Sequence, residues 1–186
     1  DVTDRMRAEA KIINFGIIYG MSPFGLSQQL GVSRRKAAEF IDRYFNTYPG
    51  VREWIDHMLV EAAKSGMVRT LLGRRRWVPD LDAANRTIRS NAERIAVNAP
   101  IQGTSADMIK RAMIRVHQGL AELDSEARMV CQVHDELVLS VRENRLEKTA
   151  KFVVECMTQA LPLKVPVVVD ISRGPNWAAC RPLEIS

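Results

Sequence analysis

Two cations and two aromatic rings near the start of the chain could hold a nucleotide if they share one side of a helix. Arg7, Lys11, Phe15 and Tyr19 are spaced four residues apart, which places them in one stripe about 18 Å long at about 1.5 Å per residue. A guanidinium and an ammonium one turn apart can hold successive phosphates, and a ring further along can meet a sugar or base. An ordinary amphipathic helix with solvated cations and partly buried rings would show the same spacing, so both interpretations stay open.

One helix from Asp4 to Tyr19 is needed to hold this stripe together. The segment contains no proline, is rich in alanine and long side chains, and begins where Thr3 or Asp4 can cap the first amides. Ile13 and Ile17 lie away from the stripe and give the helix an apolar side to bury. The stripe itself can then remain in solvent.

The pattern of this segment, RxxxKxxxFGxxYG, resembles the O helix in the fingers of family A DNA polymerases, the DNA polymerase I type. The resemblance implies that Arg7 and Lys11 bind the triphosphate of an incoming deoxynucleotide, with Lys11 also acting in catalysis. It implies that Phe15 packs near the sugar, which suggests discrimination against nucleotides lacking a 3′-hydroxyl. Tyr19 would stand near the template base.

Size and composition allow a folded protein with a buried core and one or two domains. The chain has 186 residues, of which 46% are hydrophobic, and no apolar run approaches the roughly 20 residues of a membrane span. Its three cysteines lack zinc-site spacing, which fits a reducing cytoplasm, and its net charge of +5 only mildly favours a polyanionic partner. Because Asp1 is not an initiator methionine, we expect a fragment of something longer.

Helices are predicted over residues 21–31, 33–49 and 51–65. The next segment, MVRTLLGRRRWVPDL, predicts short β-strands around a turn at Gly73. Arg74 to Arg76 concentrate positive charge there and are either a solvated charge run or a set of phosphate contacts. The segment also resembles the polymerase pattern TxxGRRRxxPD, which implies nucleic acid nearby without assigning a contact to each arginine.

A long helical region is predicted from Asn85 to Leu123, and Pro100 should kink or split it. Arg94, Asn98 and Gln102 fall four apart within it and are surface polar groups by default. The surrounding string ERxxxNAPxQGTxAD resembles the palm helix of the same polymerases. By that resemblance these three residues bind template-primer DNA, with Gln102 reaching the minor groove, where every base pair presents an acceptor.

Two β-rich runs meet at His134, Asp135 and Glu136 and predict an antiparallel hairpin. Acidic residues in such a turn are usually just solvent-exposed. In the context QVHDELV they resemble the polymerase motif whose carboxylates face two Mg²⁺ ions. Asp135 would then be the metal ligand, Glu136 a catalytic acidic partner, and His134 a contact to the primer terminus, since Mg²⁺ prefers carboxylate and phosphate oxygens.

The polymerase active site also needs an aspartate from a palm strand that precedes the O helix, and this sequence does not contain that motif. We therefore expect the two-metal site to be completed by an upstream part of the same polymerase chain. The isolated segment is predicted to bind DNA weakly and salt-sensitively without extending a primer. A helix over Arg145 to Ala160 and a strand over Val165 to Ile171 are predicted to close the palm.

The sequence thus predicts an α+β fold: a helical fingers subdomain over 1–82, then a palm portion over 83–180 with a long helix, an antiparallel β-hairpin, a helix and a terminal strand, and a tail over 181–186. The expected function is template-directed DNA synthesis from deoxynucleoside triphosphates on a primer, with Mg²⁺. The competing hypothesis is a non-catalytic nucleotide-binding or DNA-binding module, which would use the same positive residues.

Overall fold

The computed structural model describes residues 2–124 and 126–184. Contacts within the chain divide it into two compact units, Asp1–Thr104 and Ser105–Ser186. Within these described residues helices predominate, accompanied by three antiparallel pairs of short strands, so the predicted α+β class is confirmed. Among the described residues no helix is long and apolar enough to cross a membrane.

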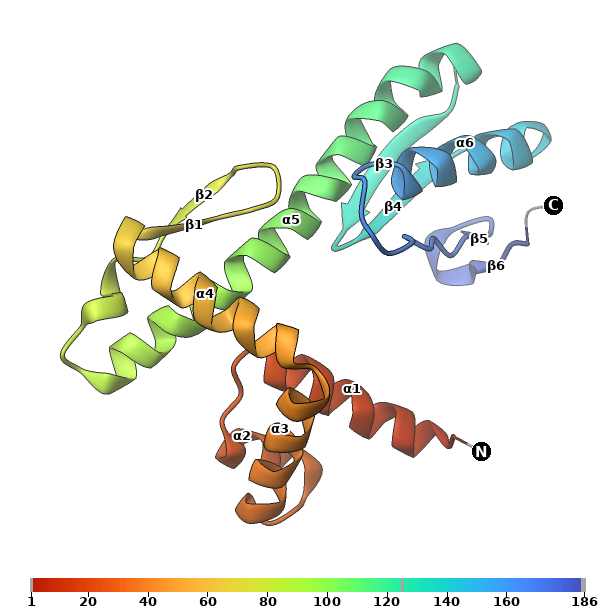
Figure 1. Cartoon of the computed structure of the whole chain (residues 1–186). Coiled ribbons are helices and arrows are strands. Elements are labelled where there is room, and N and C mark those ends of the chain that lie inside the picture. Colours follow the sequence, from red (N-terminus) through yellow and green to blue (C-terminus); the bar gives the residue numbers. More distant parts are fainter. Residues whose placement is uncertain (1, 125, 185–186) are drawn as a thin grey trace. The chain divides into compact units, whose positions relative to one another are not determined.

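In the described residues, the first unit opens with a run of helices (Figure 1). They are α1 (Asp4–Ile18), α2 (Pro23–Leu30), α3 (Arg34–Thr47) and α4 (Pro49–Ser65). The side-chain oxygens of Thr3, Ser22 and Ser33 accept hydrogen bonds from amides in the first turns of α1, α2 and α3. Such caps satisfy amides that have no partner inside the helix.

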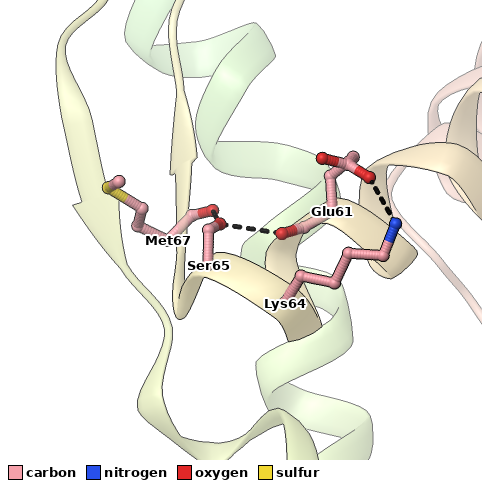
Figure 2. A network of polar contacts seen from close by, with 4 residues as sticks. All are labelled: Glu61, Lys64, Ser65 and Met67. Carbon is pink, nitrogen blue, oxygen red and sulfur yellow. Dashed lines mark hydrogen bonds and ion pairs between the residues drawn. The ribbon is translucent and has the colours of Figure 1, made fainter.

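The end of α4 is fixed by polar contacts that turn the chain into the next strand. Gly66 ends the helix in the left-handed conformation, with φ of 68°. The Ser65 hydroxyl lies 2.7 Å from the Glu61 carbonyl oxygen and 2.9 Å from that of Met67, so it bridges the helix end and the strand (Figure 2). Lys64 pairs with the Glu61 carboxylate at 3.0 Å, and this ion pair lowers the pKa of Glu61.

Strand β1 (Met67–Arg69) pairs antiparallel with β2 (Arg75–Trp77), which confirms the predicted strands around Gly73. A short 3₁₀ helix, η1 (Pro79–Asp82), follows. One side of this hairpin packs on a buried cluster that includes residues of α4 and of the long helix α5 (Arg86–Leu123): Ala62, Val68, Val78, Ala92 and Ala96. Burial of these apolar side chains is what places the hairpin beside α5.

Helix α5 runs from Arg86 to Leu123 as one continuous helix with Pro100 inside it, so of the predicted kink or split at Pro100 the split does not occur. A proline in a helix interior removes one backbone hydrogen bond and costs about 3 kcal/mol. Here the Pro100 ring is buried. Packing also holds the helix on both sides of Pro100, since Ala96 belongs to the first buried cluster and Val116 to the second.

The turn between β1 and β2 is clamped against α5 at the end of the first unit. A Cβ on Gly103 would lie 2.6 Å from the Thr70 methyl group, so only glycine permits this approach. The Thr104 hydroxyl accepts a hydrogen bond from the Leu71 amide at 3.0 Å and donates one to the Pro100 carbonyl at 2.6 Å. The arginine-bearing hairpin is therefore tied to the helix by backbone and hydroxyl contacts.

The second unit is built around the predicted β-hairpin. Strand β3 (Arg128–Val133) pairs antiparallel with β4 (Glu136–Ser140), and helix α6 (Leu146–Thr158) follows a 3₁₀ turn, η2 (Glu143–Arg145). Both elements pack with the last turns of α5 on one cluster: Val116, Leu120, Ala127 and Cys156. Both the predicted hairpin and the helix after it are thus confirmed.

The predicted strand over Val165–Ile171 is not formed. A strand needs a neighbour for its amides and carbonyls, and no strand of the described residues pairs with this segment. Two short strands come instead, β5 (Ser172–Arg173) and β6 (Arg181–Pro182), which pair with each other around the 3₁₀ helix η3 (Trp177–Ala179). Residues 181–182 of the expected tail are therefore part of this structure.

We predict that a methyl group on Gly119 destabilises the second unit. A Cβ there would overlap the ring of Phe152 on α6, and overpacking of this kind costs about 1–3 kcal/mol. Gly119→Ala should lower the urea midpoint of unfolding. Gly50→Ala is the matched control, because a Cβ at Gly50 meets nothing within 4 Å and alanine is the better helix former. Equal midpoints for the two variants would show that the Phe152 ring has room to move.

We predict that Thr104→Val loosens the turn between β1 and β2. The valine keeps the side-chain shape but loses the hydrogen bond from the Leu71 amide, which contributes about 1 kcal/mol. Amide hydrogen exchange at Leu71 should accelerate several-fold. Thr47→Val is the control, since the Thr47 hydroxyl donates only to the Arg43 carbonyl within α3. Unchanged exchange at Leu71 would refute the clamp.

Candidate functional site

Helix α1 presents the predicted stripe to solvent. Arg7, Lys11 and Phe15 are exposed, with 53% of Phe15 accessible, whereas Ile17 is buried on another side of the helix. The rings of Phe15 and Tyr19 are nearly parallel, with centroids 6.1 Å apart and planes inclined by 17°. The helix thus carries two cations and then two aligned rings on a surface that a ligand can reach.

The C-terminal end of α1 is locked by two backbone hydrogen bonds. The Gly20 amide donates to the Ile17 carbonyl at 3.0 Å, and the Met21 amide donates to the Gly16 carbonyl at 2.7 Å. Gly20 has φ of 72°, a conformation that glycine adopts at little cost. This turn fixes the position of Tyr19, the last residue before it.

A cavity of about 630 Å³ in the first unit gathers four of the predicted site residues. Tyr19 lines it from the end of α1, and Arg94, Asn98 and Gln102 line it from successive turns of α5. The β1–β2 hairpin contributes its cations to the same wall: Arg69, Arg74, Arg75 and Arg76. The structure therefore brings together residues that are up to 83 positions apart in the sequence, from Tyr19 to Gln102.

Charge in this cavity has one sign. Five guanidinium groups line it, and none of the described residues in its lining is acidic. Like charges that gather in a concave site focus a positive potential and attract anions. Arginine is also the side chain best suited to hold phosphate oxygens with two hydrogen bonds. The cavity is therefore built for a polyanion.

Arg94 and Asn98, which both line the cavity, differ in their hydrogen bonding. An Arg94 guanidinium nitrogen donates to the Asn91 side-chain oxygen at 3.2 Å, which steadies the arginine one turn along α5. The Asn98 side-chain oxygen is buried and has no hydrogen-bond partner within the described part of the chain. A buried acceptor without a donor costs free energy, so a bound ligand or water with a donor group would stabilise it.

The predicted acidic turn lies in the second unit. His134 and Asp135 form a two-residue connection between β3 and β4, and Glu136 pairs with Val133 directly after it. His134 has φ of 53°, which is uncommon for a residue other than glycine. The Gln132 side-chain amide donates to the His134 carbonyl at 2.8 Å and holds this conformation.

The carboxylates of Asp135 and Glu136 are exposed and adjacent in the chain. They are the ligand type that Mg²⁺ prefers, but its octahedral shell needs more oxygens than this pair supplies. No group of three His, Cys, Asp or Glu side chains that could hold a metal ion occurs within residues 2–124 and 126–184. The described residues therefore do not make a complete metal site.

Some supporting residues escape the sequence analysis. Asn91 could have been found, because it precedes Arg94 by three residues and shares its side of the helix. Gln132 offers no such signal, since nothing in the sequence indicates that the side chain of this strand residue hydrogen-bonds to the His134 carbonyl in the turn. Thr104 likewise depends on a contact with Leu71, 33 residues away.

Comparison with known proteins gives consistent matches. Residues 1–179 match DNA polymerase family A. DNA polymerase I of Geobacillus stearothermophilus is 49% identical over 177 residues, which cover 95% of this chain and 20% of the relative. Thermostable DNA polymerase I of Thermus thermophilus is 47% identical over 176 residues, covering 95% of this chain and 21% of the relative.

The fold matches as well. The POL domain of Pol1 from M. smegmatis, solved in complex with DNA primer-template and dNTP, aligns with a TM-score of 0.85 and 43% sequence identity, covering 89% of this chain and 29% of that one. This chain spans about a fifth of the length of the curated relatives that it matches. The match extends over nearly the whole chain in both sequence and structure, and the chain therefore belongs to DNA polymerase family A.

Proposed function

We propose that this chain forms part of a template-directed DNA polymerase. The reaction is attack of a primer 3′-hydroxyl on the α-phosphate of a deoxynucleoside triphosphate, with release of pyrophosphate. The observation that carries the proposal is the cavity in which Tyr19, Arg94 and Gln102 meet the arginines of the hairpin with no acidic residue in the described lining. The family membership supports it.

Helix α1 is the proposed nucleotide-binding surface. Arg7 and Lys11 bind the triphosphate, where their fixed positive charge neutralises the phosphate oxygens as charge builds up during transfer. Phe15 contacts the sugar and Tyr19 the template base, which agrees with the nearly parallel orientation of their rings. Lys11 is placed among the catalytic residues because it would touch the departing pyrophosphate.

The cavity is the proposed contact with template-primer DNA. Arg94 neutralises a phosphate, and the amides of Asn98 and Gln102 meet groups of the duplex at the insertion site. Every base pair presents an acceptor in the minor groove, so the Gln102 amide can test the shape of a pair without reading its sequence. The partnerless oxygen of Asn98 supports a polar ligand in this cavity.

The turn at His134–Glu136 in the second unit is proposed to carry the residues that act on the primer terminus and the metal. His134 contacts the primer terminus, Asp135 ligates the metal, and Glu136 is its acidic neighbour. Mg²⁺ supplies neutralisation of the attacking and leaving oxygens when bound. We propose that a third carboxylate comes from an upstream part of the polymerase, in keeping with the described residues, which include no group of three metal-ligating side chains.

The subdomain division follows the same proposal. Residues 1–82 correspond to fingers and 83–180 to the C-terminal palm. Of the expected tail over 181–186, Arg181 and Pro182 pair with β5. The boundaries of these subdomains differ from those of the two compact units. Helix α5 lies wholly in the proposed palm, whereas it contributes residues to both compact units. A second function, a non-catalytic nucleotide-binding or DNA-binding module, is favoured for the isolated chain by its incomplete metal site.

We predict that the chain supports DNA synthesis when the rest of a family A polymerase is supplied by a relative. The corresponding segment of the Geobacillus stearothermophilus polymerase, 49% identical to this chain, is replaced by residues 1–179, and primer extension is measured. Asp135→Asn should reduce extension about a thousandfold, since a metal contributes several kcal/mol to the transition state. Asp170→Asn, which changes an exposed carboxylate of the same unit, is the control. A chimera that binds template-primer but never extends it would favour the binding module.

We predict that His134→Gly separates stability from activity. Glycine avoids the cost of about 1–2 kcal/mol that an L residue bears at a positive φ but loses about 0.5–1 kcal/mol to its greater chain entropy, so the free energy of unfolding should rise by about 0.5–1 kcal/mol. Extension by the chimera should fall because the contact to the primer is lost. Asp135→Gly is the stability control, since Asp135 is not in the left-handed region. If His134→Gly lowered stability, the strain assigned to this turn would be absent.

A further inference from the structure

We infer that Gly20 is a positioning residue for Arg94 and thereby for the DNA contact in the cavity, an inference that rests on the proposed function. A Cβ on Gly20 would lie 3.1 Å from Arg94 Cγ and 3.6 Å from Cδ. The aliphatic stem of the arginine therefore passes directly over the bare backbone at the end of α1.

The backbone at Gly20 cannot easily yield to such a side chain. It is held by the hydrogen bonds from the Gly20 and Met21 amides to the end of α1. The partly buried Met21 side chain packs against Gly16 and Gly25, since a Cβ on Gly16 would lie 3.2 Å from its sulfur and one on Gly25 2.9 Å from its Cγ. A methyl group at position 20 would therefore displace Arg94 rather than the turn.

The Arg94 side chain is the part that can move. It is exposed, and its one described partner is the Asn91 oxygen at 3.2 Å. A displacement of its stem carries the guanidinium away from Asn91 and to a different place in the cavity. Arg94 then loses its alignment with the phosphate, although no atom of the cation has been removed.

The chain contains matched controls for the strain that alanine itself brings. Gly31 and Gly66 have φ of 64° and 68°, close to the 72° of Gly20, and a Cβ at either meets nothing within 4 Å. Gly66→Ala therefore reports the backbone cost alone. Any excess effect of Gly20→Ala over Gly66→Ala comes from the contact with Arg94.

The test measures binding of a fluorescent primer-template duplex to the 186-residue chain at low salt. Gly20→Ala should raise Kd about three- to tenfold over Gly66→Ala. Arg94→Ala should lower the slope of log K against log salt by about 0.9, as expected for one lost phosphate contact. In the Arg94→Ala background, Gly20→Ala should have no further effect on Kd. Equal Kd values for the two glycine variants, or an effect that persists without Arg94, would overturn the inference.

A second measurement does not depend on DNA. The Nε–H signal of Arg94 in a ¹H–¹⁵N spectrum, assigned by its loss in Arg94→Ala, should shift in Gly20→Ala and stay in place in Gly66→Ala. No difference between the two spectra would refute the contact. If the signal shifts but the unsubstituted chain binds no duplex, the packing stands and the proposed function fails.

Discussion

The architecture of the first unit depends on one close approach between the β1–β2 hairpin and helix α5. The turn between β1 and β2 reaches α5 only because Gly103 has no side chain and because the Thr104 hydroxyl receives the Leu71 amide. Without that approach, the arginines of the hairpin and the polar groups of α5 would be separate surface features. With it, they become walls of one cavity, and the sequence QGT at the middle of a helix acquires a structural reason.

Concentrating five guanidinium groups in a cavity works against folding, because the cations repel one another. Solvent reduces the repulsion, since most of these side chains are exposed. The apolar cluster beneath the hairpin supplies the compensating stability. A bound polyanion would remove the repulsion and satisfy the buried oxygen of Asn98. The repulsion that destabilises the free chain and the free energy gained when a polyanion binds therefore both come from the same guanidinium groups.

Local signals explain what the sequence predicts well. Serine and threonine caps, glycine stops and alternating apolar residues determine the helices and hairpins within a few residues, and the motifs assigned the site residues by resemblance.

The predictions that failed depend on contacts with distant parts of the chain. Pro100 was expected to kink or split α5, and α5 is not split, because packing on both sides of Pro100 outweighs one lost hydrogen bond. The Val165–Ile171 segment has the composition of a strand, yet composition cannot supply the neighbour that a strand requires. Contacts such as Gln132 to His134 or Gly20 to Arg94 depend on conformation and on distant residues, so no local pattern contains them. The roles of the site residues stay predictions.

The unpaired segment before β5 has a consequence for the chain in solution. Val165 and Val168 are 65% and 81% exposed, and the run VPVVVDI combines β-branched side chains with a single charge. Extended β-branched segments that no neighbouring strand covers can pair with the same segment of another molecule and form intermolecular sheets. Pro166 interrupts this segment at one position by removing an amide donor. Self-association through this segment would increase with protein concentration, and Pro166 is the residue in the chain's own sequence that opposes it.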